Sequence, residues 1–137
     1  MSVRRIDVFF YGLFMDEALL RAKGTDPSDP RVACLPGFAL RIGQRGTLLP
    51  DPASSVYGVV FALPVTEVAG LYASDGFTDY KAEAVLVQLA GGPFTPALCF
   101  NLITPPGPDE ANPEYAEKLR ALSARLGLPG AYVAGIA

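Results

Sequence analysis

The stretch IDVFFYGLF, residues 6–14, carries the two signals that decide the fold. Residues 6–11 are rich in β-branched and aromatic side chains, which is typical of a buried β-strand. Gly12 ends this strand, and the helix-forming residues 17–23 begin only a few positions later. We therefore predict a strand that runs through a glycine turn into a short helix.

The turn after this strand is a candidate anion site. A glycine between a strand end and a helix N-terminus exposes backbone N–H groups, which together with the helix dipole can bind a carboxylate or a phosphate. Two simpler interpretations stand beside this one. Gly12 makes a tight turn and nothing more, or the side chains of Asp16 and Glu17 accept those N–H groups themselves. Asp16 is also the predicted N-cap of the short helix.

The rest of the chain predicts a single α+β domain over residues 1–137, because no repeat or linker divides it. We expect about six strands curled into a small mixed β-barrel with flanking helices. The further predicted strands are 32–42 with a bend at Pro36-Gly37, 47–49, 56–63, 80–89 and 95–103. Turns at 43–46, 50–52 and 91–93 and loops at 25–30 and 104–110 separate them, and helices cover 64–72 and, capped by Asn112, 113–126.

Composition excludes several kinds of chemistry. The chain has no histidine, so it has no Ser-His or Cys-His nucleophile pair and no histidine-bearing zinc site. Proton transfer at neutral pH must then fall to a carboxylate, a lysine, a tyrosine, a thiol or water. The 14 acidic residues outnumber 11 scattered basic residues, which argues against a nucleic-acid partner.

The cysteines and the apolar segments indicate the compartment. Cys34 and Cys99 lie far apart in apolar contexts and are predicted to be reduced core thiols. No stretch reaches the ~20 apolar residues of a membrane helix, and the apolar run after Arg4-Arg5 is short and lacks a small-residue cleavage signal. We expect a cytoplasmic protein with no membrane partner, no metal ion and no organic cofactor.

Residues 71–80, LYASDGFTDY, join a helix end to a strand through an Asp-Gly turn. A carboxylate on such a turn can lie at the rim of a pocket, where burial raises its pKa toward that of a useful general base. Asp75 is the first candidate for that base, although Asp-Gly is also among the commonest turn dipeptides. Asp79 and Glu83 are its rivals, and strand alternation places Glu83 on the same face as Val85.

Two arginines mark a third candidate, the segment RIGQRG at 41–46. Arg41 or Arg45 could clamp an anionic ligand through a bidentate pair. A solvated loop explains the same residues, and the glycine spacing fits neither a P-loop nor a dinucleotide-binding fingerprint.

Three motifs, in this order, resemble the γ-glutamylcyclotransferase family. Its first strand runs into Tyr-Gly-(Thr/Ser)-Leu, which FFYGLF at 9–14 resembles with Leu13 at the hydroxyl position and Phe14 in place of leucine. Its Val-x-Gly-x-(Val/Leu)-Tyr-x-Leu strand is similar to VYGVVFAL at 56–63. Its Leu-Asp-x-x-Glu-Gly helix end with a following tyrosine is similar to 71–76 and Tyr80. The resemblance implies a small mixed barrel with outer helices.

The resemblance also implies a reaction and a ligand, a small γ-glutamyl or amino-acid-like molecule. In active members a glutamate takes a proton from the α-amine of a γ-glutamyl compound, and that amine attacks its own γ-carbonyl, which yields 5-oxoproline and a free amine. Backbone N–H groups of the Tyr-Gly loop hold the α-carboxylate of the substrate. Carried over to this chain, the substrate-binding residues are Tyr11, Gly12, Leu13, Phe14 and Tyr80, and Asp75 takes the place of the glutamate.

This last position departs from the family pattern. Asp75 is one methylene shorter than glutamate, which moves the carboxylate by roughly 1 to 1.5 Å, and misplacement on that scale can lower a rate ~10²-fold. Tyr72 also replaces the aspartate of the Leu-Asp pair. Three interpretations stay open: Asp75 catalyses on a shifted substrate, the pocket binds its ligand without turnover as a sensor or accessory protein, or Glu83 is the base.

Overall fold

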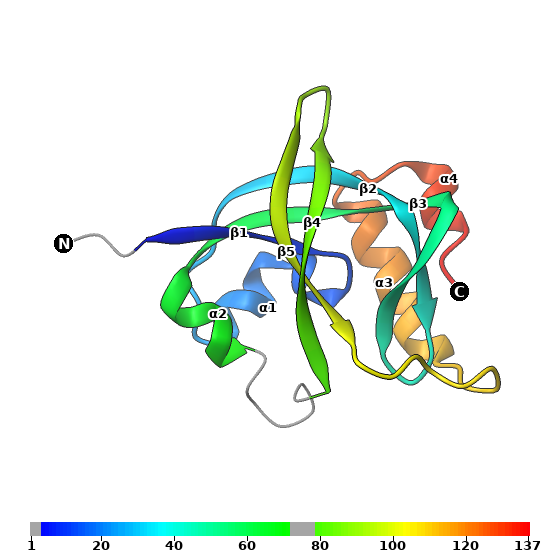
Figure 1. Cartoon of the computed structure of the whole chain (residues 1–137). Coiled ribbons are helices and arrows are strands. Elements are labelled where there is room, and N and C mark those ends of the chain that lie inside the picture. The colour runs from blue at the N-terminus through cyan, green and yellow to red at the C-terminus, as the bar shows by residue number, and fades with distance from the viewer. Residues whose placement is uncertain (1–3, 72–78) are drawn as a thin grey trace.

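The computed structural model describes residues 4–71 and 79–137. In this part of the chain, five strands close a barrel in the order β1-β3-β2-β4-β5 (Figure 1). β1 runs parallel to β5 at Val8 and Leu98, and the other neighbours are antiparallel, so the barrel is mixed as predicted. The strands are β1 (Arg5–Phe10), β2 (Ser28–Ile42), β3 (Gly46–Pro64), β4 (Tyr80–Leu89) and β5 (Phe94–Leu102).

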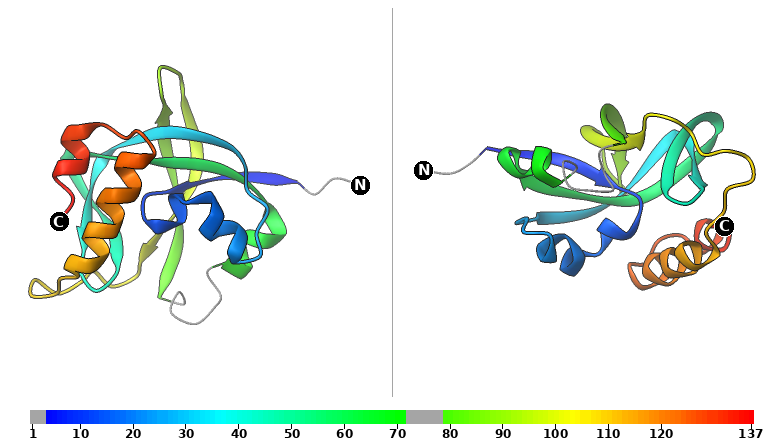
Figure 2. Two further views of the ribbon diagram at one scale, coloured as in Figure 1. Left: turned by 180° about the vertical axis from the view of Figure 1, so that it is seen from behind. Right: turned by 90° about the horizontal axis from the view of Figure 1, so that it is seen from below.

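Short helices follow the strands and flank the barrel, with α1 and α3 on the same side of it (Figure 2). Both predicted caps are confirmed: the Asp16 carboxylate accepts the Ala18 N–H at 3.0 Å, and the Asn112 amide oxygen accepts the Tyr115 N–H at 3.1 Å. No helix in the described residues is long and apolar enough to cross a membrane. The helical elements are η1 (Leu13–Met15), α1 (Glu17–Ala22), α2 (Val65–Leu71), α3 (Pro113–Arg125) and α4 (Gly130–Ala134).

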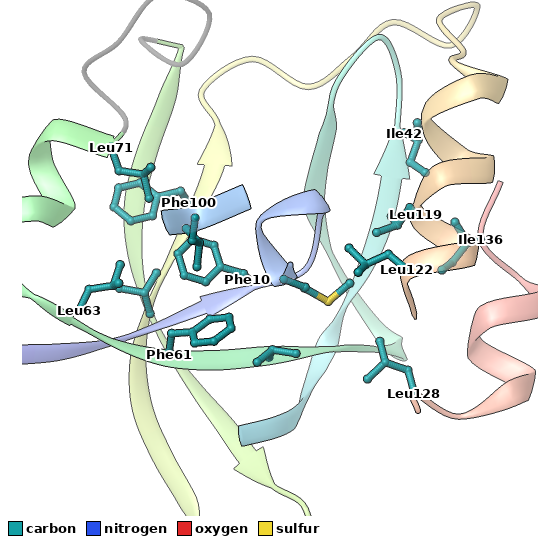
Figure 3. Close-up of a cluster of buried hydrophobic side chains, with 14 of the residues drawn as sticks. Phe10, Ile42, Phe61, Leu63, Leu71, Phe100, Leu119, Leu122, Leu128 and Ile136 are labelled. Atoms are coloured by element: carbon teal, nitrogen blue, oxygen red, sulfur yellow. The ribbon is translucent and has the colours of Figure 1, made fainter. Parts of the chain in front are cut away.

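Alternation along the strands divides the core into two layers. Phe9 belongs to a cluster with residues from all five strands, which is the filling of the barrel. Its neighbours Val8 and Phe10 point the other way and join a second cluster with residues of α1, α2 and α3. Figure 3 shows this second cluster, in which Leu119 and Leu122 of α3 face the barrel. The helices are therefore held by the outward apolar face of the strands, and β1 contributes to both layers.

Two of the expected boundaries are wrong. The strands expected at 47–49 and 56–63 are one continuous strand, β3, so the turn expected at 50–52 does not interrupt it. Pro50 lies opposite Phe38 and Ser55 opposite Pro36, so the residues between them form an irregularity in the pairing opposite the predicted bend at Pro36-Gly37. Pairing on both sides of this bulge overrides the turn signal of the two prolines.

The remaining differences are local. Ser28 was expected in a loop but begins β2, because it pairs with Ala62 of β3. The sequence pattern also contains no sign of η1 or α4, which are too short for an apolar period to develop.

Candidate functional site

The loop after β1 is built around Gly12. Its backbone is extended, with φ −111° and ψ −152°, and its carbonyl accepts the Met15 N–H at 3.0 Å to open η1. A Cβ atom on Gly12 would lie only 2.6 Å from the hydroxyl oxygen of Tyr115 on α3. Glycine is therefore required here for the close approach of Tyr115, and not for its backbone freedom.

A cavity of about 370 Å³ lies against this loop. That volume is near the lower end of the range for small-molecule sites. Side chains and backbone from β1, α1, the β2–β3 turn, the start of β4 and α3 form its wall, which is predominantly apolar and aromatic. The lining residues are Phe9, Phe10, Tyr11, Gly12, Leu13, Phe14, Leu19, Lys23, Gln44, Arg45, Gly46, Tyr80 and Tyr115.

Three tyrosines line the cavity, and the hydroxyls of Tyr80 and Tyr115 both stay protonated at neutral pH. Burial raises the pKa of Tyr115 to about 12, and a backbone hydrogen bond from Leu13 to its oxygen only partly offsets this. Burial also raises the pKa of Tyr80, whose hydroxyl donates to the Gly46 carbonyl at 2.7 Å. The Tyr115 hydroxyl can therefore donate its proton to a ligand, whereas the Tyr80 proton is already used by the Gly46 carbonyl, and both phenols are poor general bases.

Two cationic residues reach the same cavity from different elements. Lys23 is the C-cap of α1, and Arg45 lies in the turn between β2 and β3. The Arg45 guanidinium is 2.8 Å from the Asp79 carboxylate and lies over the Tyr80 ring, 5.7 Å from its centroid. These contacts hold the guanidinium at the edge of the cavity, where its side chain is 40% exposed.

The structure brings together five residues predicted from the sequence. Tyr11, Gly12, Leu13, Phe14 and Tyr80 all line the cavity, although β1 and β4 are far apart in the sequence. The Tyr11 hydroxyl donates to the Phe100 carbonyl at 2.6 Å and so ties the loop to β5. The role of these residues in binding a substrate stays a prediction.

The three candidate carboxylates fall in different places. Asp75 lies outside the described residues. Glu83 is half-buried and accepts a hydrogen bond from the Asn101 amide at 3.3 Å, but it is not among the residues that line the cavity. Asp79 is exposed and paired with Arg45. Of the two acids that were alternatives for the N–H groups, Asp16 accepts the Ala18 N–H at the start of α1, whereas Glu17 pairs with Arg21 and the Leu13 backbone bonds to Tyr115.

Of the two arginines predicted as anion-binding candidates, only Arg45 lies at the cavity. Arg45 lines the cavity, whereas Arg41 donates to the Gly107 and Glu110 carbonyls at 2.7 and 3.0 Å and so secures the loop before α3. Tyr115 was predicted only as part of the apolar stripe of α3 and is the main residue that sequence reasoning missed. A tyrosine at the first position of an otherwise leucine stripe was the available signal.

No group of three or more metal-ligating side chains occurs among residues 4–71 and 79–137. The buried Cys99 is no nucleophile, because burial first and the charge of Glu83 second raise its thiol pKa to about 12.

Comparison with known proteins gives matches to solved structures alone. No family model matches the sequence. No curated protein matches it either. The alignment with a gamma-glutamyl cyclotransferase covers 98% of this chain and 89% of that protein's chain, with 20% sequence identity and a TM-score of 0.78. The alignment with a yeast gamma-glutamyl cyclotransferase specific to glutathione covers 98% of this chain and 94% of that protein's chain, with 15% sequence identity and a TM-score of 0.68.

A third match, YkqA from Bacillus subtilis, covers 96% of this chain but only 52% of its own, with 25% identity and a TM-score of 0.71. These similarities establish a shared fold over nearly the whole chain, and the predicted barrel architecture is confirmed.

Proposed function

We propose that this chain, which has the fold of the gamma-glutamyl cyclotransferases, catalyses cyclotransfer on a small γ-glutamyl amide or amine. The α-amine of the γ-glutamyl group gives up a proton and attacks the γ-carbonyl carbon, which closes a five-membered ring. The γ-amide C–N bond then breaks. The leaving nitrogen takes up a proton and departs as a free amine, and 5-oxoproline remains.

One observation carries this proposal: the cavity lies against the loop and the tyrosine at which the family resemblance puts the substrate. Its volume of about 370 Å³ suits a molecule the size of a dipeptide. A largely apolar wall also favours intramolecular attack, because it restricts a bound substrate to folded conformers.

The α-carboxylate of the substrate binds at the Tyr11–Phe14 loop in this proposal. The Tyr115 hydroxyl accepts from the Leu13 backbone, so it can pass its own proton in a hydrogen bond to the carboxylate. The Tyr80 hydroxyl donates to the Gly46 carbonyl, and a Cβ atom on Gly46 would lie 3.1 Å from the Tyr115 hydroxyl oxygen, so both tyrosines lie beside Gly46. Hydrogen bonds to a charged carboxylate are the stronger kind, so the contact with Tyr115 orients the γ-glutamyl half.

Asp75 is the proposed general base, on the strength of its place in the sequence order. The tyrosines are unsuited to that role because their pKa values are raised. Glu83 is the second candidate, since it is half-buried and the Asn101 amide orients its carboxylate. The free cysteines Cys34 and Cys99 agree with a reducing, cytoplasmic setting.

The alternative function is ligand binding without turnover, as a sensor or accessory protein. The observation that favours it is that none of the described residues lining the cavity carries a carboxylate. Such a protein would bind the same γ-glutamyl compounds without the group that deprotonates the amine.

The test incubates the purified protein with γ-glutamyl amino acids and γ-glutamyl amines and measures 5-oxoproline. We expect product from wild type, loss of product in Asp75→Asn, and unchanged rates in the matched control Asp109→Asn, which removes a carboxylate from the exposed loop before α3. If Glu83→Gln forms no 5-oxoproline while Asp75→Asn still does, the general base is Glu83. No product from any compound, together with ligand-dependent thermal stabilisation, would establish the binding protein instead.

A further inference from the structure

Asn112 uses both ends of its side-chain amide. The amide oxygen accepts the Tyr115 N–H at 3.1 Å and caps α3, and the amide nitrogen donates to the Gln44 carbonyl at 3.0 Å. One end meets a donor and the other meets an acceptor, so these two partners fix the orientation of the amide. A single side chain therefore joins the start of α3 to the β2–β3 turn, which lies 68 residues away in the sequence.

The two elements that Asn112 joins both form walls of the cavity. α3 supplies Tyr115, and the turn supplies Gln44, Arg45 and Gly46. A Cβ atom on Gly46 would lie 3.1 Å from the Tyr115 hydroxyl oxygen, and one on Gly12 would lie 2.6 Å from it. The hydroxyl therefore lies between the start of β3 and the loop after β1, and a shift of α3 relative to the turn would displace it.

The loop before α3 also holds the other backbone group of this turn, which it runs beside (Figure 1). The Glu110 carboxylate accepts the Gln44 N–H at 3.3 Å and the Gly107 N–H at 2.7 Å. Side chains of one loop thus bind both the N–H and the carbonyl of Gln44. Gln44 is exposed, so water can replace these partners at little cost in stability. What the two contacts provide is the position of the turn.

The residue type at position 112 fits this second contact. Aspartate and serine cap helices about as well as asparagine does, because each offers an oxygen to the backbone N–H groups of the first turn. A carboxylate only accepts hydrogen bonds, and a serine hydroxyl ends one bond short of the place of the amide nitrogen. Capping therefore does not require asparagine, whereas the bond to the Gln44 carbonyl does.

We infer that Asn112 is a positioning residue: through its one amide it holds the Tyr115 hydroxyl in register with the β2–β3 turn. This inference rests on the proposed function, in which that hydroxyl orients the α-carboxylate of the substrate. Asn112 is not among the residues that line the cavity beside Gly12, so it takes no part in bond making. It acts on the substrate through Tyr115.

The test separates capping from positioning by substitution. Asn112→Asp and Asn112→Ser keep an oxygen for the Tyr115 N–H and lose the bond to the Gln44 carbonyl, whereas Asn112→Ala loses both contacts. We expect the first two variants to melt within about 2 °C of wild type, and Asn112→Ala to melt about 3–5 °C lower. Ala111→Asp is the matched control, because it adds the same charge at a neighbouring exposed residue and leaves the amide intact.

The dissociation constant of γ-glutamyl-leucine, measured by calorimetry, reports on the cavity, and 5-oxoproline is measured in parallel. We expect Asn112→Asp and Asn112→Ser to bind this probe about 10-fold more weakly than wild type, and Ala111→Asp to bind it equally well. A residue that acts through the Tyr115 hydroxyl loses its effect when that hydroxyl is removed. In a Tyr115→Phe background, Asn112→Asp should therefore weaken binding by no more than about 2-fold.

The outcomes separate the inference from the proposed function. Unchanged binding in Asn112→Asp and Asn112→Ser, or an equal loss with and without the Tyr115 hydroxyl, overturns the inference even where 5-oxoproline is formed. Melting of both variants as low as Asn112→Ala also overturns it, because the contact with Gln44 then stabilises the fold as a whole. The expected binding pattern without 5-oxoproline supports the inference and contradicts the catalytic proposal. Failure of wild type to bind the probe overturns both.

Discussion

Replacing Gly12 with alanine tests the packing that shapes the cavity. The new Cβ atom would lie 2.6 Å from the Tyr115 hydroxyl oxygen, so the hydroxyl must move by roughly 0.8 Å to restore an ordinary contact of 3.4 Å. The Gly12 backbone is extended, so alanine brings no backbone strain. We expect overpacking of this kind to lower the free energy of unfolding by about 1–3 kcal/mol.

Tyr115→Phe supplies the matched background. Without the hydroxyl, the nearest ring atom is Cζ, at 3.9 Å from the new methyl carbon of alanine, which is ordinary van der Waals contact. Gly12→Ala should then be neutral or stabilising by about 0.4–1 kcal/mol, because alanine restricts the unfolded chain. That effect on the unfolded chain is the same in both backgrounds, so the difference between them isolates the contact.

Urea unfolding of the wild type, the two single variants and the double variant measures this coupling. We expect a coupling of at least about 1 kcal/mol, with the double variant more stable than the sum of the single changes predicts. An equal effect of Gly12→Ala in both backgrounds would refute the proposed packing of Tyr115 against the loop.

Three further predictions concern titration and reactivity. Hydrogen bonds from the Gly107 and Gln44 backbones lower the pKa of Glu110, so this carboxylate stabilises the fold fully above pH 4.5, and the stabilisation is lost as the pH falls through the lowered pKa. In urea unfolding, Glu110→Gln should therefore lose less stability on acidification than wild type does, and an unchanged pH profile would contradict this. The raised pKa of Tyr115 works in the opposite direction: the contribution of this hydroxyl to stability is full below pH 10 and is lost as the pH rises toward about 12. Tyr115→Phe should therefore lose stability less steeply than wild type at alkaline pH in the same assay, and an equally steep loss would count against burial of the hydroxyl. Cys99 is 0% exposed and its pKa is raised to about 12. A thiol reagent at neutral pH should therefore label the folded variant Cys34→Ser, which keeps only Cys99, far more slowly than the folded variant Cys99→Ser, which keeps only Cys34, and similar rates would contradict the burial of Cys99.

The sequence predicted the elements whose signals are local. The β-branched and aromatic composition of β1, the Asp16 and Asn112 caps and the glycine-rich turn of the β4–β5 hairpin depend on neighbouring residues, and all appear where they were expected. The continuity of β3 through two prolines could not be predicted, because it depends on pairing with β2 across the bulge at Gly37.

The site residues also divide into those with a local sequence signal and those placed by long-range packing. The Tyr11–Phe14 loop and Tyr80 were found from motifs that can be read along the chain. Tyr115 and Lys23 were not, because their place at the cavity follows from how α3 and α1 pack against the barrel. Arg45 was identified as one of two candidates, and only the structure distinguishes it from Arg41, which serves the loop before α3.

The central claim is that the cavity beside Gly12 is where a γ-glutamyl compound cyclises. The most direct measurement is the release of 5-oxoproline and leucine from γ-glutamyl-leucine by wild type, by the cavity-filling variant Leu19→Trp, and by the control Leu86→Trp. Leu19 lines the cavity, whereas Leu86 is 60% exposed on β4 and does not. The account predicts equal amounts of both products from wild type and from the control, and neither product from folded Leu19→Trp. No 5-oxoproline from wild type, or full activity in Leu19→Trp, would contradict it.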